Sequence, residues 1–158
     1  MKIDVIVEIT KGSRNKYEIN KETGRVKFDR VLRSSVAYPA DYGMVPNTLC
    51  DDGDPLDVLI INRFPTFPGC EVSVRPLGVF KMVDTGENDE KIIAVAEKDY
   101  YFENWKDLKD VHPAMLAEIE EFFMTYKNLE KGKTVASNGW GDAKEAEKVI
   151  KDSIAKVK

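Results

Sequence analysis

Hydrophobic and polar residues alternate along the first part of the chain. Over residues 3–9 the apolar positions recur every second residue, which is the period of a half-buried β-strand. The same period returns over residues 16–20 and, after a turn at residues 22–24, over residues 25–28. We therefore predict that the chain begins with a series of short strands.

Three further apolar stretches follow at residues 56–61, 72–83 and 92–96. Gly, Pro, Asn and Asp separate these stretches at short intervals, as they do between the closely connected strands of all-β folds. We therefore expect an antiparallel barrel, or a strongly curled sheet, up to about Ala96.

The period of the apolar residues then changes. From Met115 to Leu129 they recur at steps of three and four, which predicts a helix with a wide apolar face, and Pro113 suits its first turn. Asp142, with Glu145 three residues later, is a capping-box signal for a second helix. The predicted buried face of that helix comprises Ala146, Val149, Ile150 and Ile154. Because the strands come first and the helices last, we predict an α+β fold with both helices packed on the barrel.

Composition narrows the class of protein. The chain has 158 residues, with 24 Lys and Arg against 28 Asp and Glu. This length predicts a single domain over residues 1–158. The acidic balance argues against a general binder of nucleic acid or of anionic membranes. No apolar run is long enough to span a membrane, and the two cysteines, Cys50 and Cys70, match no zinc spacing. We expect a cytoplasmic protein with free thiols.

The strongest chemical signal is an acidic segment at residues 51–57, with four carboxylates in seven residues. Asp-Gly and Asp-Pro are common in turns, so a solvated turn is an alternative for residues 52–55. A turn does not explain Asp57, which enters an apolar strand on the same face as Leu59 and Ile61. A carboxylate there is costly unless it is paired or bound to a metal. The segment lacks the Gly and Glu spacing of an EF-hand, and we predict another kind of divalent-cation site.

A second acidic segment, residues 84–91, joins two predicted strands. Taken alone it indicates a polar hairpin loop, but together with the first segment it could complete a site for several metal ions. Oxygen ligands without His or Cys favour Mg²⁺. The only histidine, His112, precedes Pro113 and is better interpreted as a helix-start residue, which leaves a Ser-His or Cys-His nucleophile without support.

Cationic and phenolic side chains occur at positions that turn chemistry does not explain, namely Lys16, Arg30, Tyr126, Lys127 and Lys133. Each alone is an ordinary surface or core residue. Residues 38–43 put two tyrosines around a Pro/Gly turn, which we interpret as a ligand-facing loop and a poor core segment. Metal-binding carboxylates that face Lys, Arg and Tyr donors suit a small, highly charged phosphate substrate.

These motifs resemble those of the family I (soluble) inorganic pyrophosphatases. Residues 52–57 reproduce the D-G-D-P-x-D signature of that family. The other family motifs follow the same order over nearly the whole chain: Glu8, K-Y-E at 16–18, D-R at 29–30, Y-P-x-x-Y-G at 38–43, K-M-x-D at 81–84, Asp89, Lys91, and Y-K-x-L-E-x-G-K at 126–133.

The resemblance implies a five-stranded OB-like antiparallel β-barrel with two flanking helices. It also implies Mg²⁺-dependent hydrolysis of pyrophosphate to two phosphates, in which Asp54 deprotonates the attacking water. The implied metal ligands are Asp52, Asp57, Asp84, Asp89 and Glu18. The implied phosphate contacts are Lys16, Arg30, Tyr42, Lys91, Tyr126 and Lys127. Glu8, Tyr38 and Lys133 would line the site.

Two other functions remain open on the residues alone. One is a Mg²⁺-dependent hydrolase of nucleotides or other phosphate esters, which would need a base-stacking pocket. The other is a non-catalytic OB-type binder of nucleic acid, which would use basic grooves with aromatic platforms. Aromatic residues make up only 9% of the chain and the signature segment is acidic, which disfavours the second alternative. The resemblance also implies a homo-oligomer, with a hexamer favoured by the short length of the chain.

Overall fold

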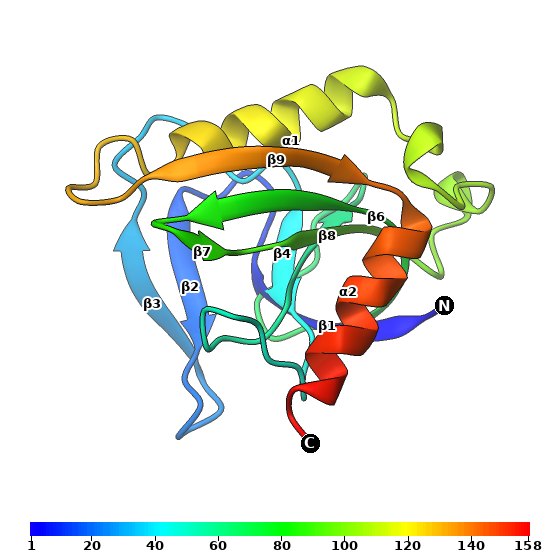
Figure 1. Cartoon of the computed structure of the whole chain (residues 1–158), viewed down its shortest axis with the longest axis horizontal. Coiled ribbons are helices and arrows are strands. Elements are labelled where there is room, and N and C mark those ends of the chain that lie inside the picture. Colours follow the sequence, from blue (N-terminus) through cyan, green and yellow to red (C-terminus); the bar gives the residue numbers. More distant parts are fainter.

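Five strands form a closed ring (Figure 1). In order around the ring these are β1 (Ile3–Ile9), β4 (Asp41–Met44), β5 (Asp57–Ile61), β8 (Lys91–Ala96) and β6 (Glu71–Asp84). The ring closes because β6 pairs back with β1. The computed structural model describes residues 1–158. The predicted α+β barrel is therefore confirmed.

The expectation that every pair of strands is antiparallel is wrong for one pair. β5 and β8 run parallel, with Asp57 opposite Lys91 and Ile61 opposite Val95. A parallel pair needs a crossover connection of a dozen or more residues, and residues 62–90 supply it. The parallel register has a chemical consequence, because it brings an acidic and a basic side chain together at the start of both strands.

The strands β5 and β8 read as nearly continuous apolar runs because both of their faces are covered. One face, which includes Leu59, packs in a core cluster with α1 (Pro113–Thr125). The other face, which includes Val58, packs in a second cluster with Ile150 of α2 (Ala143–Ala155). The two helices therefore flank the ring, as predicted (Figure 1).

Both helices begin where the sequence indicated. The His112 ring accepts a hydrogen bond from the Ala114 backbone N–H at 3.0 Å, and Pro113 is the first residue of α1. The Asp142 carboxylate accepts one from the Glu145 N–H at 3.0 Å. These bonds satisfy backbone donors that have no partner inside the helix.

The predicted extent of the apolar helix faces is wrong at two positions. Leu129 lies beyond the end of α1 at Thr125 and is 62% exposed. Ile154 is 37% exposed in the last turn of α2. Leu129 has left the helix and Ile154 lies in the last helical turn, so the apolar period continues beyond the residues that are buried.

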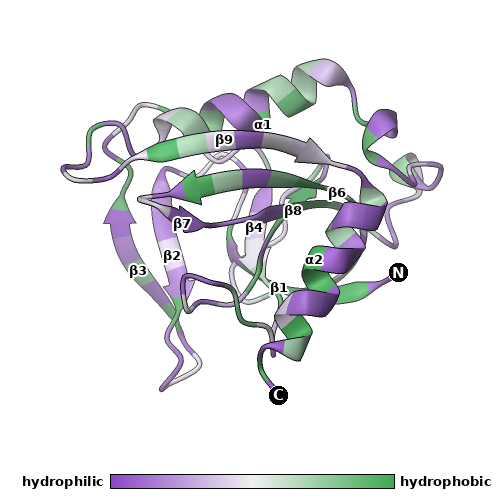
Figure 2. Ribbon diagram, viewed as in Figure 1, coloured by the Kyte–Doolittle hydropathy of each residue, from purple (hydrophilic) through white to green (hydrophobic).

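A two-stranded hairpin stands outside the ring. It consists of β2 (Asn15–Ile19) and β3 (Val26–Val31), and Figure 2 shows that both strands are largely hydrophilic. The register puts Lys16 opposite Arg30. Two predicted phosphate contacts therefore lie side by side.

Residues 38–43 are largely buried, which corrects their interpretation as a poor core segment, while Tyr42 also lines the cavity described below. Residues 41–44 form β4, and the Tyr38 and Tyr42 side chains are buried. Gly43 permits this arrangement because a Cβ there would lie 2.2 Å from the Ile6 carbonyl oxygen. Gly43, which suggests a turn in the sequence, instead permits a close approach between β1 and β4.

One long strand was not predicted. β9 (Val135–Gly141) pairs with β6, whose 14 residues extend beyond the ring and offer it an edge. The sequence of β9 contains Asn and Gly and lacks a period of two, so only pairing with β6 makes it a strand. Two 3₁₀ helices, Tyr100–Phe102 and Leu108–Asp110, lead from β8 to α1. No helix is both long enough and apolar enough to cross a membrane.

Candidate active site

The first acidic segment is a tight turn between β4 and β5. Its backbone closes on itself, because the Cys50 N–H donates to the Asp54 carbonyl at 2.8 Å and the Gly53 N–H donates to the Cys50 carbonyl at 3.0 Å. Gly53 has φ +83°, a conformation that favours glycine. The Asp52 carboxylate accepts from the Asp54 N–H at 3.0 Å. The turn interpretation is thus correct for these residues, and the turn also presents Asp52 and Asp54 to a cavity.

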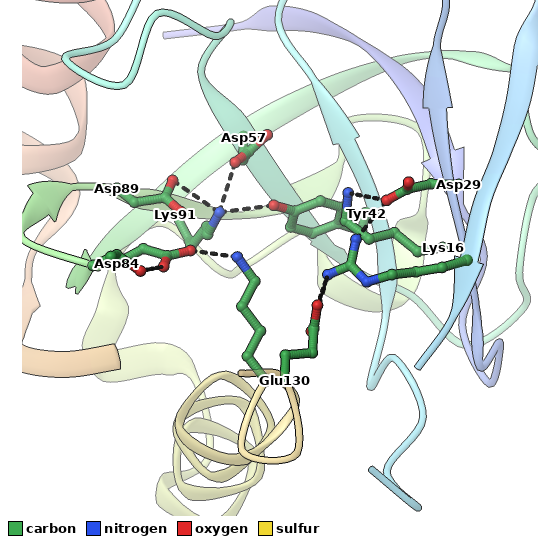
Figure 3. A network of polar contacts seen from close by, with 11 residues as sticks. Lys16, Asp29, Tyr42, Asp57, Asp84, Asp89, Lys91 and Glu130 are labelled. Carbon is green, nitrogen blue, oxygen red and sulfur yellow. Dashed lines mark hydrogen bonds and ion pairs between the residues drawn. The ribbon is translucent and has the colours of Figure 1, made fainter. Parts of the chain in front are cut away.

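Asp57 is paired with a buried lysine. The Lys91 Nζ donates to Asp57 at 2.6 Å, to Asp89 at 2.9 Å and to the Tyr42 hydroxyl at 2.8 Å (Figure 3). The Lys91 side chain is only 2% exposed. Burial alone would lower its pKa, but the Asp57 carboxylate and its neighbours outweigh burial and raise the pKa of Lys91 well above its usual range. Lys91 is therefore a fixed positive charge among the acids.

The second acidic segment begins at the end of β6 and includes β7 (Glu87–Asn88). The Asp84 carboxylate accepts hydrogen bonds from the Lys127 ammonium and from the Thr85 hydroxyl. Burial would raise the pKa of Asp84, but these bonds outweigh burial and lower it. Asp84 is held as a carboxylate by a cation from the segment after α1.

The two acidic segments meet at one cavity of about 250 Å³. Its acidic lining consists of Glu8, Glu18, Asp52, Asp54, Asp57, Asp84 and Asp89. Its basic and phenolic lining consists of Lys16, Lys21, Lys91, Lys127, Tyr17, Tyr42 and Tyr126. A second hollow is lined by Asp52, Asp54, Asp84, Asp89, Thr85, Glu87 and Lys133. Of the residues predicted for the site, only Arg30 and Tyr38 line neither hollow.

Burial, and after it the crowding of carboxylates, raises the pKa of several acids of the site. Burial, and then the Asp57 and Glu18 charges, raise the pKa of Glu8 to about 7, although the Ile19 N–H bonds to it. Burial, followed by the neighbouring Asp89, Asp54 and Asp57 charges, raises the pKa of Asp52 to about 6. Burial also raises the pKa of Asp89, in spite of its bond to Lys91. Such a cluster is stabilised by added positive charge.

The arrangement fits hard cations by its chemistry. Every acidic ligand is an oxygen donor, and no His or Cys lines either hollow. Lys91 and Lys127 lie between the acids, and no three carboxylates converge on a common point. A divalent cation would therefore have to compete with the Lys127 ammonium for Asp84.

Arg30 lines neither hollow and is paired with two acids. Its guanidinium contacts Asp29, which in turn contacts the Lys16 ammonium at 3.4 Å. Arg30 Nη2 also lies 2.9 Å from Glu130 Oε1. Figure 3 shows Lys16 and Asp29 on the far side of Tyr42 from Asp84 and Asp89. Lys16, which is paired with an acid of its own, therefore lies on the other side of Tyr42 from Asp84 and Asp89.

One of the predicted roles is corrected and another stays a prediction. Tyr38 does not line the site but supports it, since its ring packs 5.4 Å from the Tyr42 ring and 4.6 Å from the Phe122 ring. Lys91 lines the cavity and its three donors are used by Asp57, Asp89 and Tyr42, so its contact with a substrate stays a prediction. Both residues were assigned from the resemblance. A motif match indicates where a residue lies in the sequence, but it does not indicate the hydrogen-bond partners of its side chain.

Two residues of the site were missed. Glu130 holds Arg30, and Lys21 approaches the Asp54 carboxylate at 3.7 Å from the β2–β3 hairpin. Glu130 lies in the quoted motif at residues 126–133, so the motif could have indicated it. Nothing in the sequence indicates Lys21, whose position depends on how the hairpin leans toward the acidic turn.

Comparison with known sequences gives one consistent match. A family model described as inorganic pyrophosphatase matches residues 5–158. The chain is 55% identical over 152 residues to an inorganic pyrophosphatase of Leifsonia xyli subsp. xyli. The aligned region covers 96% of this chain and 93% of the relative. The chain is also 49% identical over 158 residues to an inorganic pyrophosphatase of Corynebacterium efficiens. That aligned region covers 100% of this chain and 99% of the relative.

Solved structures agree with the sequence comparison. An inorganic pyrophosphatase from Helicobacter pylori superposes with a TM-score of 0.96 at 40% identity, over 99% of this chain and 93% of that one. An inorganic pyrophosphatase from Thermus thermophilus also has a TM-score of 0.96, at 41% identity, over 99% of this chain and 91% of that one. The similarity therefore extends over the whole ring and both helices.

Proposed function

Because the chain belongs to the inorganic pyrophosphatase family and hydrolyses inorganic pyrophosphate, we propose that water attacks the phosphoanhydride directly, with Mg²⁺ as cofactor and Asp54 as general base. Members of this family are typically dependent on divalent metals. Direct attack by water needs no covalent intermediate with the chain, which fits a cavity lining without Ser, Cys or His.

The observation that carries this proposal is the convergence of two acidic segments on one cavity. Asp52 and Asp57 come from one segment and Asp84 and Asp89 from the other, and we assign these four as metal ligands, with Glu18 beside them. Oxygen donors of this kind suit Mg²⁺. Bound there, Mg²⁺ would lower the pKa of the attacking water and offset the negative charge of the phosphates.

We assign Asp54 as the base because it is the least committed acid of the turn. Its side chain is 68% exposed, and its ion-pair partner, Lys21, is 3.7 Å away. Asp57 and Asp84, by contrast, are held closely by Lys91 and Lys127. A carboxylate that faces the cavity without a close cation can accept a proton from water.

The phosphate contacts in this proposal are donors that now bond to carboxylates. Lys16 contacts Asp29, Arg30 contacts Asp29 and Glu130, and Lys127 contacts Asp84. Pyrophosphate oxygens would replace these carboxylates as acceptors of charge-assisted hydrogen bonds. Tyr126 and Tyr42 add hydroxyl donors, and Lys91, which now pairs with Asp57 and Asp89, adds a third ammonium.

We also propose the domain organisation, the cellular location and the assembly of the protein. Residues 1–158 form one domain, and the cytoplasmic protein is a homo-oligomer, with a hexamer favoured. Sedimentation analysis of the purified protein tests the assembly, because a hexamer and a monomer differ sixfold in mass.

Phosphate release with two substrates tests the proposed function. With Mg²⁺ the protein should release phosphate rapidly from pyrophosphate and slowly from ATP, and excess chelator should abolish the activity. Rapid turnover in chelator would contradict the oxygen-ligand metal site. Equal rates on ATP and pyrophosphate would instead favour a general hydrolase of phosphate compounds.

A further inference from the structure

Lys21 lines the cavity, although none of the sequence motifs includes it. It lies in the turn between β2 and β3, and its ammonium faces Asp54 Oδ1 at 3.7 Å (Figure 1). This distance is too long for a hydrogen bond, and Asp54 is the only ion-pair partner of Lys21. Both side chains are 68% exposed. Lys21 is therefore a largely exposed cation beside the proposed general base.

The other lysines of the cavity are held more closely by acids. Lys91 is 2% exposed and Lys127 is 15% exposed, and both bond to carboxylates of the site. Lys16 is 23% exposed and contacts Asp29 at 3.4 Å. A bound anion has to displace a carboxylate from each of these lysines. From Lys21 it displaces only a long, solvent-exposed contact, which contributes little.

The backbone around Lys21 is fixed, although its side chain is free. The Asn20 N–H donates to the Arg25 carbonyl at 2.8 Å and closes the turn. The hairpin is joined to the ring next to this turn, because the Glu8 carboxylate of β1 accepts from the Ile19 N–H at 2.9 Å. Only the side chain of Lys21 has to move for its ammonium to exchange one partner for another.

We propose that Lys21 is a further substrate-binding residue, whose ammonium leaves Asp54 and donates to a phosphate oxygen when pyrophosphate binds. This inference rests on the proposed function. Pyrophosphate carries more negative charge than one carboxylate, so the exchange gives Lys21 a stronger charge-assisted partner. It also leaves Asp54 without a cation beside it at the stage at which Asp54 accepts a proton from water.

The kinetic constants separate this role from an indirect one through Asp54. Loss of a contact that is made equally in the bound substrate and in the transition state raises KM and leaves kcat unchanged. A lysine that acted only by pairing with Asp54 would instead change kcat, because its removal would alter the base. Lys21 is mostly exposed, so the expected rise in KM is about three- to tenfold.

Steady-state release of phosphate from pyrophosphate, at Mg²⁺ saturating for each variant, tests the inference. Lys21→Gln should raise KM by about three- to tenfold and keep kcat within about twofold of the wild type. Lys21→Arg, which keeps a charged donor, should have a KM within about twofold of the wild type. Arg25→Gln is the matched control, since it removes the same charge from an exposed residue of the same hairpin that lines neither hollow. Its KM and kcat should be those of the wild type.

The inference is overturned if Lys21→Gln keeps the wild-type KM, or if its kcat changes while KM does not. It is also overturned if Arg25→Gln raises KM as much, because general attraction of the anion would then explain the effect. In each of these cases the wild type still hydrolyses pyrophosphate with Mg²⁺, and the proposed function stands. If the wild type releases no phosphate under these conditions, the proposed function fails first and the role of Lys21 fails with it.

Discussion

Lys127, just after α1, forms an ion pair across the cavity with Asp84, at the end of β6. The proposed ligands of the two partners have opposite charges, because Asp84 would bind Mg²⁺ and Lys127 would bind phosphate. Neither ligand can bind fully while the pair is closed. Metal binding and the release of Lys127 toward the substrate are therefore coupled.

This coupling predicts opposite effects of one substitution. Lys127→Met should strengthen Mg²⁺ binding to the free protein, because the cation no longer competes with an ammonium for Asp84. It should lower kcat/KM for pyrophosphate by about tenfold or more, since a hydrogen bond to a charged group contributes about 1.5–3 kcal/mol. Mg²⁺ titration and steady-state kinetics measure the two effects. Lys131→Met, at an exposed lysine nearby, should change neither, and weaker Mg²⁺ binding by Lys127→Met would contradict the coupling.

Removal of the buried lysine should make the fold depend on metal. Lys91→Met leaves Asp57 and Asp89 without their common partner, and breaking a buried ion pair typically costs about 3–5 kcal/mol. Mg²⁺ should restore part of this loss because it supplies the missing positive charge. We expect a lower Tm in chelator and a larger Mg²⁺-induced rise than in the wild type. Thermal melts with and without Mg²⁺ measure both, and an equal rise in the two proteins would contradict the role of Lys91.

The raised pKa values predict how stability depends on pH in chelator. The pKa of Glu8 is raised to about 7 and that of Asp52 to about 6, so between pH 5 and 7 the native state binds more protons than the unfolded chain. The free energy of unfolding should therefore fall as the pH rises through this window. Urea denaturation at a series of pH values measures the slope. Glu8→Gln should flatten it, whereas the exposed Glu118→Gln should not, and a slope of the opposite sign would exclude this account.

The thiols should be dispensable. Cys50 and Cys70 are free, and neither lines the cavity. The double substitution Cys50→Ser and Cys70→Ser should therefore retain a kcat close to that of the wild type. A large loss of kcat with an unchanged Tm would show that a thiol takes part in the reaction.

Much of the fold was predictable because local signals agreed with tertiary packing. His112 and Asp142 cap helices where their side chains can reach free backbone donors. The burial of Tyr38 and Tyr42 was missed because Pro and Gly between apolar residues usually mark a turn, and the strand there depends on the approach of β1 to Gly43. The strand β9 was unpredictable from its own residues, since β6 alone determines it.

Part of the site was predictable because a local sequence pattern required a partner for a polar side chain. Asp57 was recognisable as functional because a carboxylate in an apolar strand needs a partner, and the structure supplies Lys91. That this partner would be a lysine on a parallel neighbouring strand could not be read from periodicity. Lys21 and the Asp51–Lys156 contact depend on how loops pack, and no local pattern indicates them.

The role of Asp54 is the central claim, and kcat for phosphate release tests it most directly. With saturating Mg²⁺ and pyrophosphate, Asp54→Asn should lower kcat by about 10²–10⁴, the usual contribution of a general base, while Mg²⁺ affinity changes little. Glu22→Gln, at an exposed carboxylate between β2 and β3, should keep the wild-type kcat. If Asp54→Asn also keeps the wild-type kcat across the pH range, Asp54 is not the base, and the proposed mechanism is contradicted.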